Sequence, residues 1–177
     1  MAGQTFDATN LGGQLRYMAW AIRRGLEACR PLTEEELRRG LGTPLESVRG
    51  LLTHVFGVSW WFYTLLADQE PPYPAWLDDP APVPLATIEQ DFADLQAGYE
   101  ALASRLERPG EAADWAATTI TVHGASLRRW QVVLQVVGHT THHLGQLACD
   151  LRLLGRKGAL TDIIVYFVEA EGRPWPG

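Results

Sequence analysis

Apolar residues recur every three or four positions along most of the chain, and this spacing predicts amphipathic α-helices. Helices are predicted over residues 8–29, 45–68, 85–106, 126–154 and 162–171. The spacing is clearest in the third segment, where the apolar residues share one stripe: Ile88, Phe92, Leu95, Tyr99 and Leu102. Four long helices, a short C-terminal helix and no long run of alternating residues predict an all-α four-helix bundle.

The segments between these helices carry signals of their own. Residues 32–36 have the spacing of a capping box, with Thr33 three positions before Glu36, and predict a short helical turn. Residues 69–84 contain six prolines. Because proline cannot continue a helix, this stretch is expected to be a long rigid crossover after the second long helix, and no linker between domains. Residues 118–122 are β-branched and precede a His-Gly turn signal, which fits either a short hairpin or an irregular loop.

The composition of the chain limits which classes of protein it can belong to. A chain of 177 residues with 46% hydrophobic content can bury a core of its own, so residues 1–177 are expected to form a single domain. The net charge is -6, from 15 basic and 21 acidic residues, and no basic patch suits a phosphate backbone. A nucleic-acid partner is therefore not expected.

The sequence also bears on location. The N-terminal residues lack both a cationic start and an apolar core, and no uninterrupted apolar run approaches about 18 residues. No membrane association is predicted, and a cytoplasmic location is expected. Two cysteines, Cys29 and Cys149, make no disulfide framework and are expected to be small buried hydrophobic residues.

The run GHTTHHLGQ, residues 138–146, holds three of the five histidines. On a helix, His139 and His143 lie about 40° apart and one turn from each other, the spacing with which two imidazoles share one ion. The zincin helix has the same spacing, but the glutamate that serves there as general base is missing. A metal site that acts on a substrate needs a third protein ligand, and His54 is the best candidate.

Other interpretations of these histidines stay open. His54 lies on an apolar helix face, where it is either a structural histidine with both ring nitrogens satisfied or a ligand or acid-base group. Polar residues within about 40° of His139 form either a cavity wall or a solvated face. His142 points about 60° away from the other two and is assigned to a supporting or surface position. His123 falls in a loop and by itself indicates no site.

Two separated motifs carry a resemblance to a known family. The first is Leu51-Leu52-Thr53-His54, and the second is His139-Thr140-Thr141-His142-His143-Leu144-Gly145-Gln146, followed by a closing segment over residues 151–166. Together they resemble the DinB/YfiT-like superfamily of small metal-binding four-helix bundles. The chain departs from the common motif at two positions, with Gly138 where asparagine is frequent and Leu144 where arginine is frequent.

The resemblance implies a metal triad of His54, His139 and His143, the same residues that helical geometry selects. Zinc or nickel is expected as the divalent metal ion, although iron, cobalt and manganese also accept three imidazoles. His142, Gln146 and Asp150 are expected as the residues that support the imidazoles.

The resemblance further implies a transferase that uses a low-molecular-weight thiol. The metal would hold the thiol sulfur as a thiolate, which attacks an electrophilic substrate in a pocket walled by Trp61 and Phe62. The alternative is a non-catalytic metal-stabilised bundle that acts in dimerisation or interaction, and a homodimer is left open. Hydrolysis by a bound hydroxide needs a general base, for which Asp150 is a poor candidate because it is two to three turns from His139.

Overall fold

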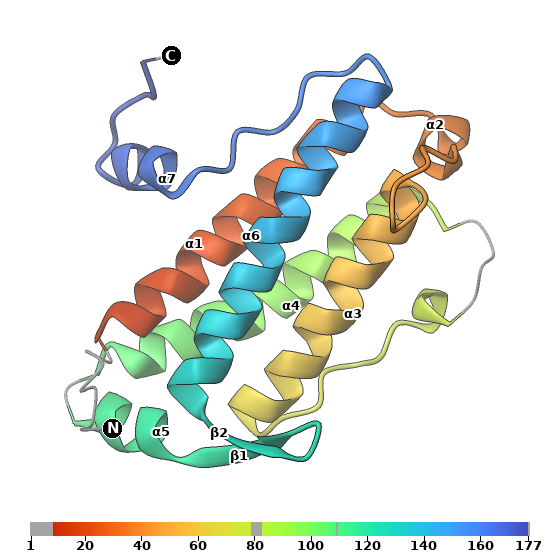
Figure 1. The fold of residues 1–177 in the computed structure, drawn as a ribbon. Coiled ribbons are helices and arrows are strands. Elements are labelled where there is room, and N and C mark those ends of the chain that lie inside the picture. The colour runs from red at the N-terminus through yellow and green to blue at the C-terminus, as the bar shows by residue number, and fades with distance from the viewer. Residues whose placement is uncertain (1–8, 79–82, 109, 177) are drawn as a thin grey trace.

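Four long helices pack side by side in the computed structural model, which describes residues 9–78, 83–108 and 110–176 (Figure 1). They are α1 (Thr9–Cys29), α3 (Val48–Ala67), α4 (Leu85–Leu106) and α6 (Arg129–Leu153). Helix α1 packs against α4 and α6, and α3 packs against the same two helices. Each long helix thus has two neighbours, and the predicted all-α bundle is confirmed.

Shorter elements lie at the ends of the bundle and on one of its faces. Helix α2 (Glu34–Arg38) precedes α3, α5 (Glu111–Ala117) follows α4, and α7 (Ile163–Ala170) follows α6. Strands β1 (Thr119–Val122) and β2 (Ala125–Arg128) form an antiparallel hairpin, the first of the two structures that the sequence left open. Its turn residues, His123 and Gly124, have φ values of 47° and 81°, as a tight two-residue hairpin turn requires.

The interior of the bundle is apolar, and its aromatic residues meet edge to face. Phe56 of α3 lies against Phe92 of α4, with ring centroids 4.9 Å apart. Tyr99 is fully buried, and its hydroxyl donates a hydrogen bond to the Ser59 carbonyl at 2.7 Å. This bond ties α4 to α3 within the core.

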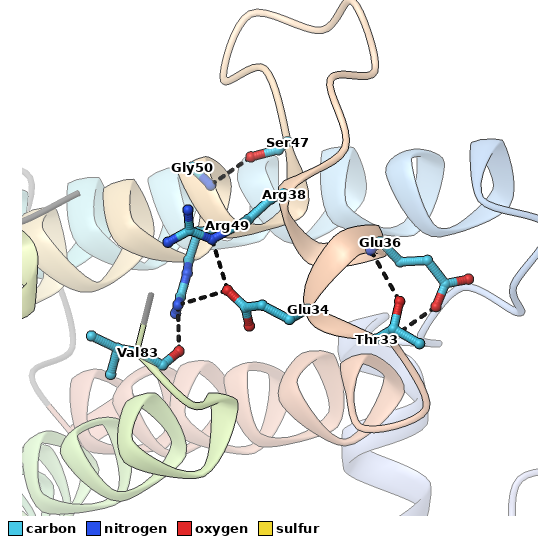
Figure 2. A network of polar contacts seen from close by, with 8 residues as sticks. All are labelled: Thr33, Glu34, Glu36, Arg38, Ser47, Arg49, Gly50 and Val83. Atoms are coloured by element: carbon cyan, nitrogen blue, oxygen red, sulfur yellow. Dashed lines mark hydrogen bonds and ion pairs between the residues drawn. The ribbon is translucent and has the colours of Figure 1, made fainter. Parts of the chain in front are cut away.

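The corner between α2 and α3 is held by side chains (Figure 2). Thr33 caps α2, and Glu36 bonds back to the Thr33 amide, so the predicted capping box is confirmed. Glu34 accepts from Arg38 at 2.7 Å and pairs with Arg49 of α3. Arg49 also donates to the Val83 carbonyl, so one guanidinium joins α2, α3 and the start of α4.

Helix α7 is attached to α1 by polar contacts. Arg24 pairs with Glu169 at 2.6 Å, and Trp20 donates to the same carboxylate. The Tyr17 hydroxyl donates to the Thr161 carbonyl. These contacts place the C-terminal helix across one face of the bundle.

Some predicted boundaries are wrong. The fourth long helix begins at Arg129 and not at 126, because residues 125–128 pair as β2. Helix α5 was not predicted, and a 3₁₀ turn (Ala75–Leu77) interrupts the crossover. Residues 1–8, 79–82, 109 and 177, which include the predicted first position of the first helix and part of the crossover, lie outside the described residues.

Side-chain exposure and helix composition bear on two further expectations from the sequence. Cys29 is buried as expected, but Cys149 is exposed, so that prediction is wrong for one of the two cysteines. Of the described helices, α3 alone is long and apolar enough by length and composition to cross a membrane. A core helix passes the same test, and α3 packs against α6 and α4 within the bundle.

Candidate metal centre

Three imidazoles meet where α3 faces α6. His54 lies in the second turn of α3, and His139 and His143 lie one turn apart in the middle of α6. The Nε2 atom of His54 is 3.0 Å from that of His139 and 3.1 Å from that of His143. The two α6 histidines have their Nε2 atoms 3.1 Å apart. All three side chains are half-buried, and their nitrogens converge on one point between the helices.

This triangle of nitrogens is compatible with a shared divalent cation. Three imidazole nitrogens around a tetrahedral ion with Zn–N bonds of about 2.05 Å would lie about 3.3 Å from one another. A single proton joins only two of the three nitrogens, which leaves the remaining lone pair facing its neighbours. A cation at the centre satisfies all three at once, so the group is compatible with metal binding.

Gln146 fixes the orientation of one of these rings. Its Oε1 accepts a hydrogen bond from Nδ1 of His143 at 2.7 Å, and its Nε2 donates to Nε2 of His142 at 3.1 Å. A proton on Nδ1 of His143 leaves Nε2 of the neutral ring with its lone pair directed at the other imidazoles. The sequence predicts that Gln146 and His142 support the imidazoles. In the structure these two residues form a chain of contacts that ends at His143.

Burial favours the neutral forms of His139 and His54. The pKa of His139 is lowered from 6.5 to about 4, first by burial and then by the neighbouring His143, His54 and His142. The pKa of His54 is also lowered, by burial and then by His143. Neutral imidazoles are the form that binds a metal, so protons compete weakly for this site near neutral pH.

Asp150 does not support an imidazole in this structure. It is buried on α6, and its Oδ2 has no hydrogen-bond partner. Nδ1 of His139 is also buried without a partner. Helical spacing put Asp150 on the correct face of α6, but two turns beyond His143, which is about 10 Å along the axis.

The two predicted pocket residues lie further along α3. Phe62 is buried in the core, which leaves little of its surface for a substrate. Trp61 is half-buried and contacts Phe62, and its ring centroid is 4.9 Å from that of His123. The contact between Trp61 and His123 was not predicted, because only the hairpin turn carries the loop histidine back to α3.

Leu144 has a packing role where the common motif often has arginine. Its side chain is buried against α1, where a Cβ added to Gly25 would lie 2.8 Å from Leu144 Cδ2. A larger residue at position 25 would displace Leu144. The close approach of α1 and α6 therefore accounts for an apolar residue within the histidine motif.

Fold and site together define a helix-bundle protein with a three-histidine centre suited to a divalent metal ion. The sequence model of the DinB family matches residues 6–173, nearly the whole chain, and the protein belongs to the DinB family. No curated protein matches the chain. The family and the histidine group both support metal binding.

Proposed function

We propose that this protein is a cytoplasmic metal-dependent transferase that activates a low-molecular-weight thiol for attack on an electrophile. The observation that carries the proposal is the convergence of three imidazole Nε2 atoms within 3.1 Å of one another between two helices. These three histidines would hold a zinc or nickel ion, whose positive charge would favour the thiolate form of a thiol at neutral pH.

The chain contributes position and environment to this chemistry. His54, His139 and His143 would hold the ion by three ring nitrogens, and such a ligand set is typical of catalytic sites that also take an exogenous ligand. Gln146 holds the ring of His143, and the stack of Trp61 on His123 offers an aromatic wall beyond the histidines. The thiol proton leaves to water, and the sulfur forms the new bond to the electrophilic carbon while the leaving group on that carbon departs with the electron pair of its broken bond.

A turnover assay tests the proposal directly. Metal-loaded protein is incubated with glutathione, bacillithiol or mycothiol and a panel of electrophiles, and the thioether product is measured. Turnover is expected with the wild-type protein and with Asp114→Asn, an exposed change on α5, but not with His54→Ala. Equal rates for the His54→Ala and wild-type proteins, or no product with any pair, would contradict the proposal.

A second candidate function is that of a non-catalytic, metal-stabilised interaction protein. It is favoured by apolar side chains at the C-terminal end, where Leu153, Ile164 and Phe167 are each more than half exposed. Such a surface suits a homodimer. Light scattering distinguishes this candidate: it predicts a dimer that Phe167→Glu dissociates, together with metal-dependent stability and no turnover.

A further inference from the structure

A cavity of about 280 Å³ lies beside the metal centre, between α6 and the connection from α2 to α3. It starts one turn from the histidines, since Leu51 precedes His54 by three residues and Gln146 follows His143 by three. Leu51 and Asp150 are each only 1% exposed and form its floor. Cys149, which is exposed, belongs to its rim.

Two residues that line this cavity each have a buried polar atom without a hydrogen bond of normal geometry. These atoms are Asp150 Oδ2 and Thr43 Oγ1, both shielded from solvent. Burial raises the pKa of Asp150, and the nearby Thr43 hydroxyl partly offsets this rise. The contact between the hydroxyl and the carboxylate does not have the geometry of a normal hydrogen bond. A buried carboxylate without a donor is costly to maintain, so the carboxylate gains free energy when a donor enters.

The rest of the lining restricts which donor fits. Pro44, Leu45 and Leu51 make the wall largely apolar, and no arginine or lysine lines the cavity to hold an anion. A primary ammonium has only donor hydrogens, which the Asp150 carboxylate and the Thr43 hydroxyl can both accept. A short alkyl chain behind it would contact the apolar wall.

We propose that this cavity binds the primary ammonium group of a small amine, with Asp150 as the counter-ion and Thr43 as a second acceptor. His142 lines the cavity, but the proposed ammonium site is distinct from the group of His54, His139 and His143. Asp150 is two turns, about 10 Å, beyond His143 on the same face of α6. Gln146 connects the cavity with the three-histidine group, since it lines the cavity and holds the His143 ring. The proposal does not depend on thiol transfer.

Titration of the ¹⁵N-labelled full-length protein with butylammonium chloride, at matched ionic strength, tests this site. The experiment is run at pH about 8, where a primary ammonium keeps its proton. Saturable shifts of the Thr43 and Gly145 amides are expected. The dissociation constant should be at least about 10-fold lower than that of 1-butanol, which has the same chain and no charge.

Variants separate a specific ion pair from a general charge effect. Asp150→Asn should weaken butylammonium binding at least about 10-fold and leave 1-butanol binding unchanged. Asp114→Asn makes the same change in net charge outside the cavity and should have no effect. Thr43→Val, nearly isosteric, should weaken ammonium binding about 3-fold and provides a second test if Asp150→Asn fails to fold. Equal affinity for butylammonium and 1-butanol, equal losses in the two Asp→Asn variants, or no saturable shift would overturn the proposal.

Discussion

The interface of α1 with α4 and that of α3 with α6 are built from similar helices but differ in what they bury. The first packs so closely that a Cβ added to Gly12 would lie 2.9 Å from the Ala103 carbonyl oxygen. The second encloses three imidazoles and the buried Asp150. Most of the buried side-chain atoms without a partner belong to α3 and α6. The first interface thus brings two backbones into close contact, whereas the second contains polar side chains, three of which could hold a metal ion.

The largest expected effect on stability comes from disturbing the α1–α4 interface. Gly12→Leu should lower the free energy of unfolding by about 3 kcal/mol, because its Cβ meets backbone rather than a flexible side chain. Gly13→Leu is the matched control, since nothing lies within 4 Å of a Cβ added there. Chemical denaturation measures both. A folded Gly12→Leu protein should bind metal normally, and a stability equal to that of Gly13→Leu would contradict the comparison.

The next largest effect concerns Gln146, in the α3–α6 interface. Gln146→Ala should weaken metal binding about 10- to 100-fold, because the His143 ring loses the group that fixes its tautomer. Stability of the metal-free protein should change little. Gln135→Ala, on an exposed position of α6, is the control. Competition with a chromogenic chelator measures the metal affinities. Equal affinities for the two variants would show that Gln146 does not support metal binding.

A smaller change is expected where α4 meets α3. Tyr99→Phe removes the donor to the buried Ser59 carbonyl and should cost about 1 to 2 kcal/mol. Tyr73→Phe removes an exposed hydroxyl that bonds to Asp78 and should cost much less. Thermal unfolding of the two variants provides the test, and a larger loss from Tyr73→Phe would be inconsistent with this packing.

The smallest effect is a pH dependence that arises from Asp150. Its folded-state pKa is raised above the unfolded value, so the folded state holds its proton more tightly. The free energy of unfolding therefore falls as pH rises from the unfolded pKa through the raised folded pKa. Asp150→Asn lacks this titration, and its stability relative to wild type should increase over that pH range. A constant difference between the two proteins from acid to neutral pH would show that the carboxyl is not penalised by burial.

Helical periodicity was sufficient to predict the four long helices, because each has an apolar stripe many turns long. It missed α5, whose seven residues are too short to establish a period. It also placed the start of α6 too early, because the residues of β2 continue into the helix without a breaker. Local pairing with β1, which decides the boundary, depends on a partner strand and a turn.

The residues of the candidate site also divide into those that lie on one helix, which the sequence can relate, and those that only the fold brings together. His139 and His143 could be paired from their spacing, since both lie on one helix, and His54 was selected because a third ligand had to come from elsewhere. Asp150 was placed on the right face of α6, but its distance from the histidines left it unable to orient them. Thr43 was not predicted, because only the fold brings the α2–α3 connection to α6.

Zinc binding by the three histidines is the most direct test of the central claim. Isothermal titration of the chelator-treated protein should show about one zinc ion per chain. His54→Ala, His139→Ala and His143→Ala should each weaken binding at least about 100-fold, and His123→Ala should not. Unchanged affinity in any one of the first three variants, or an equal loss in His123→Ala, would contradict a metal centre shared by α3 and α6.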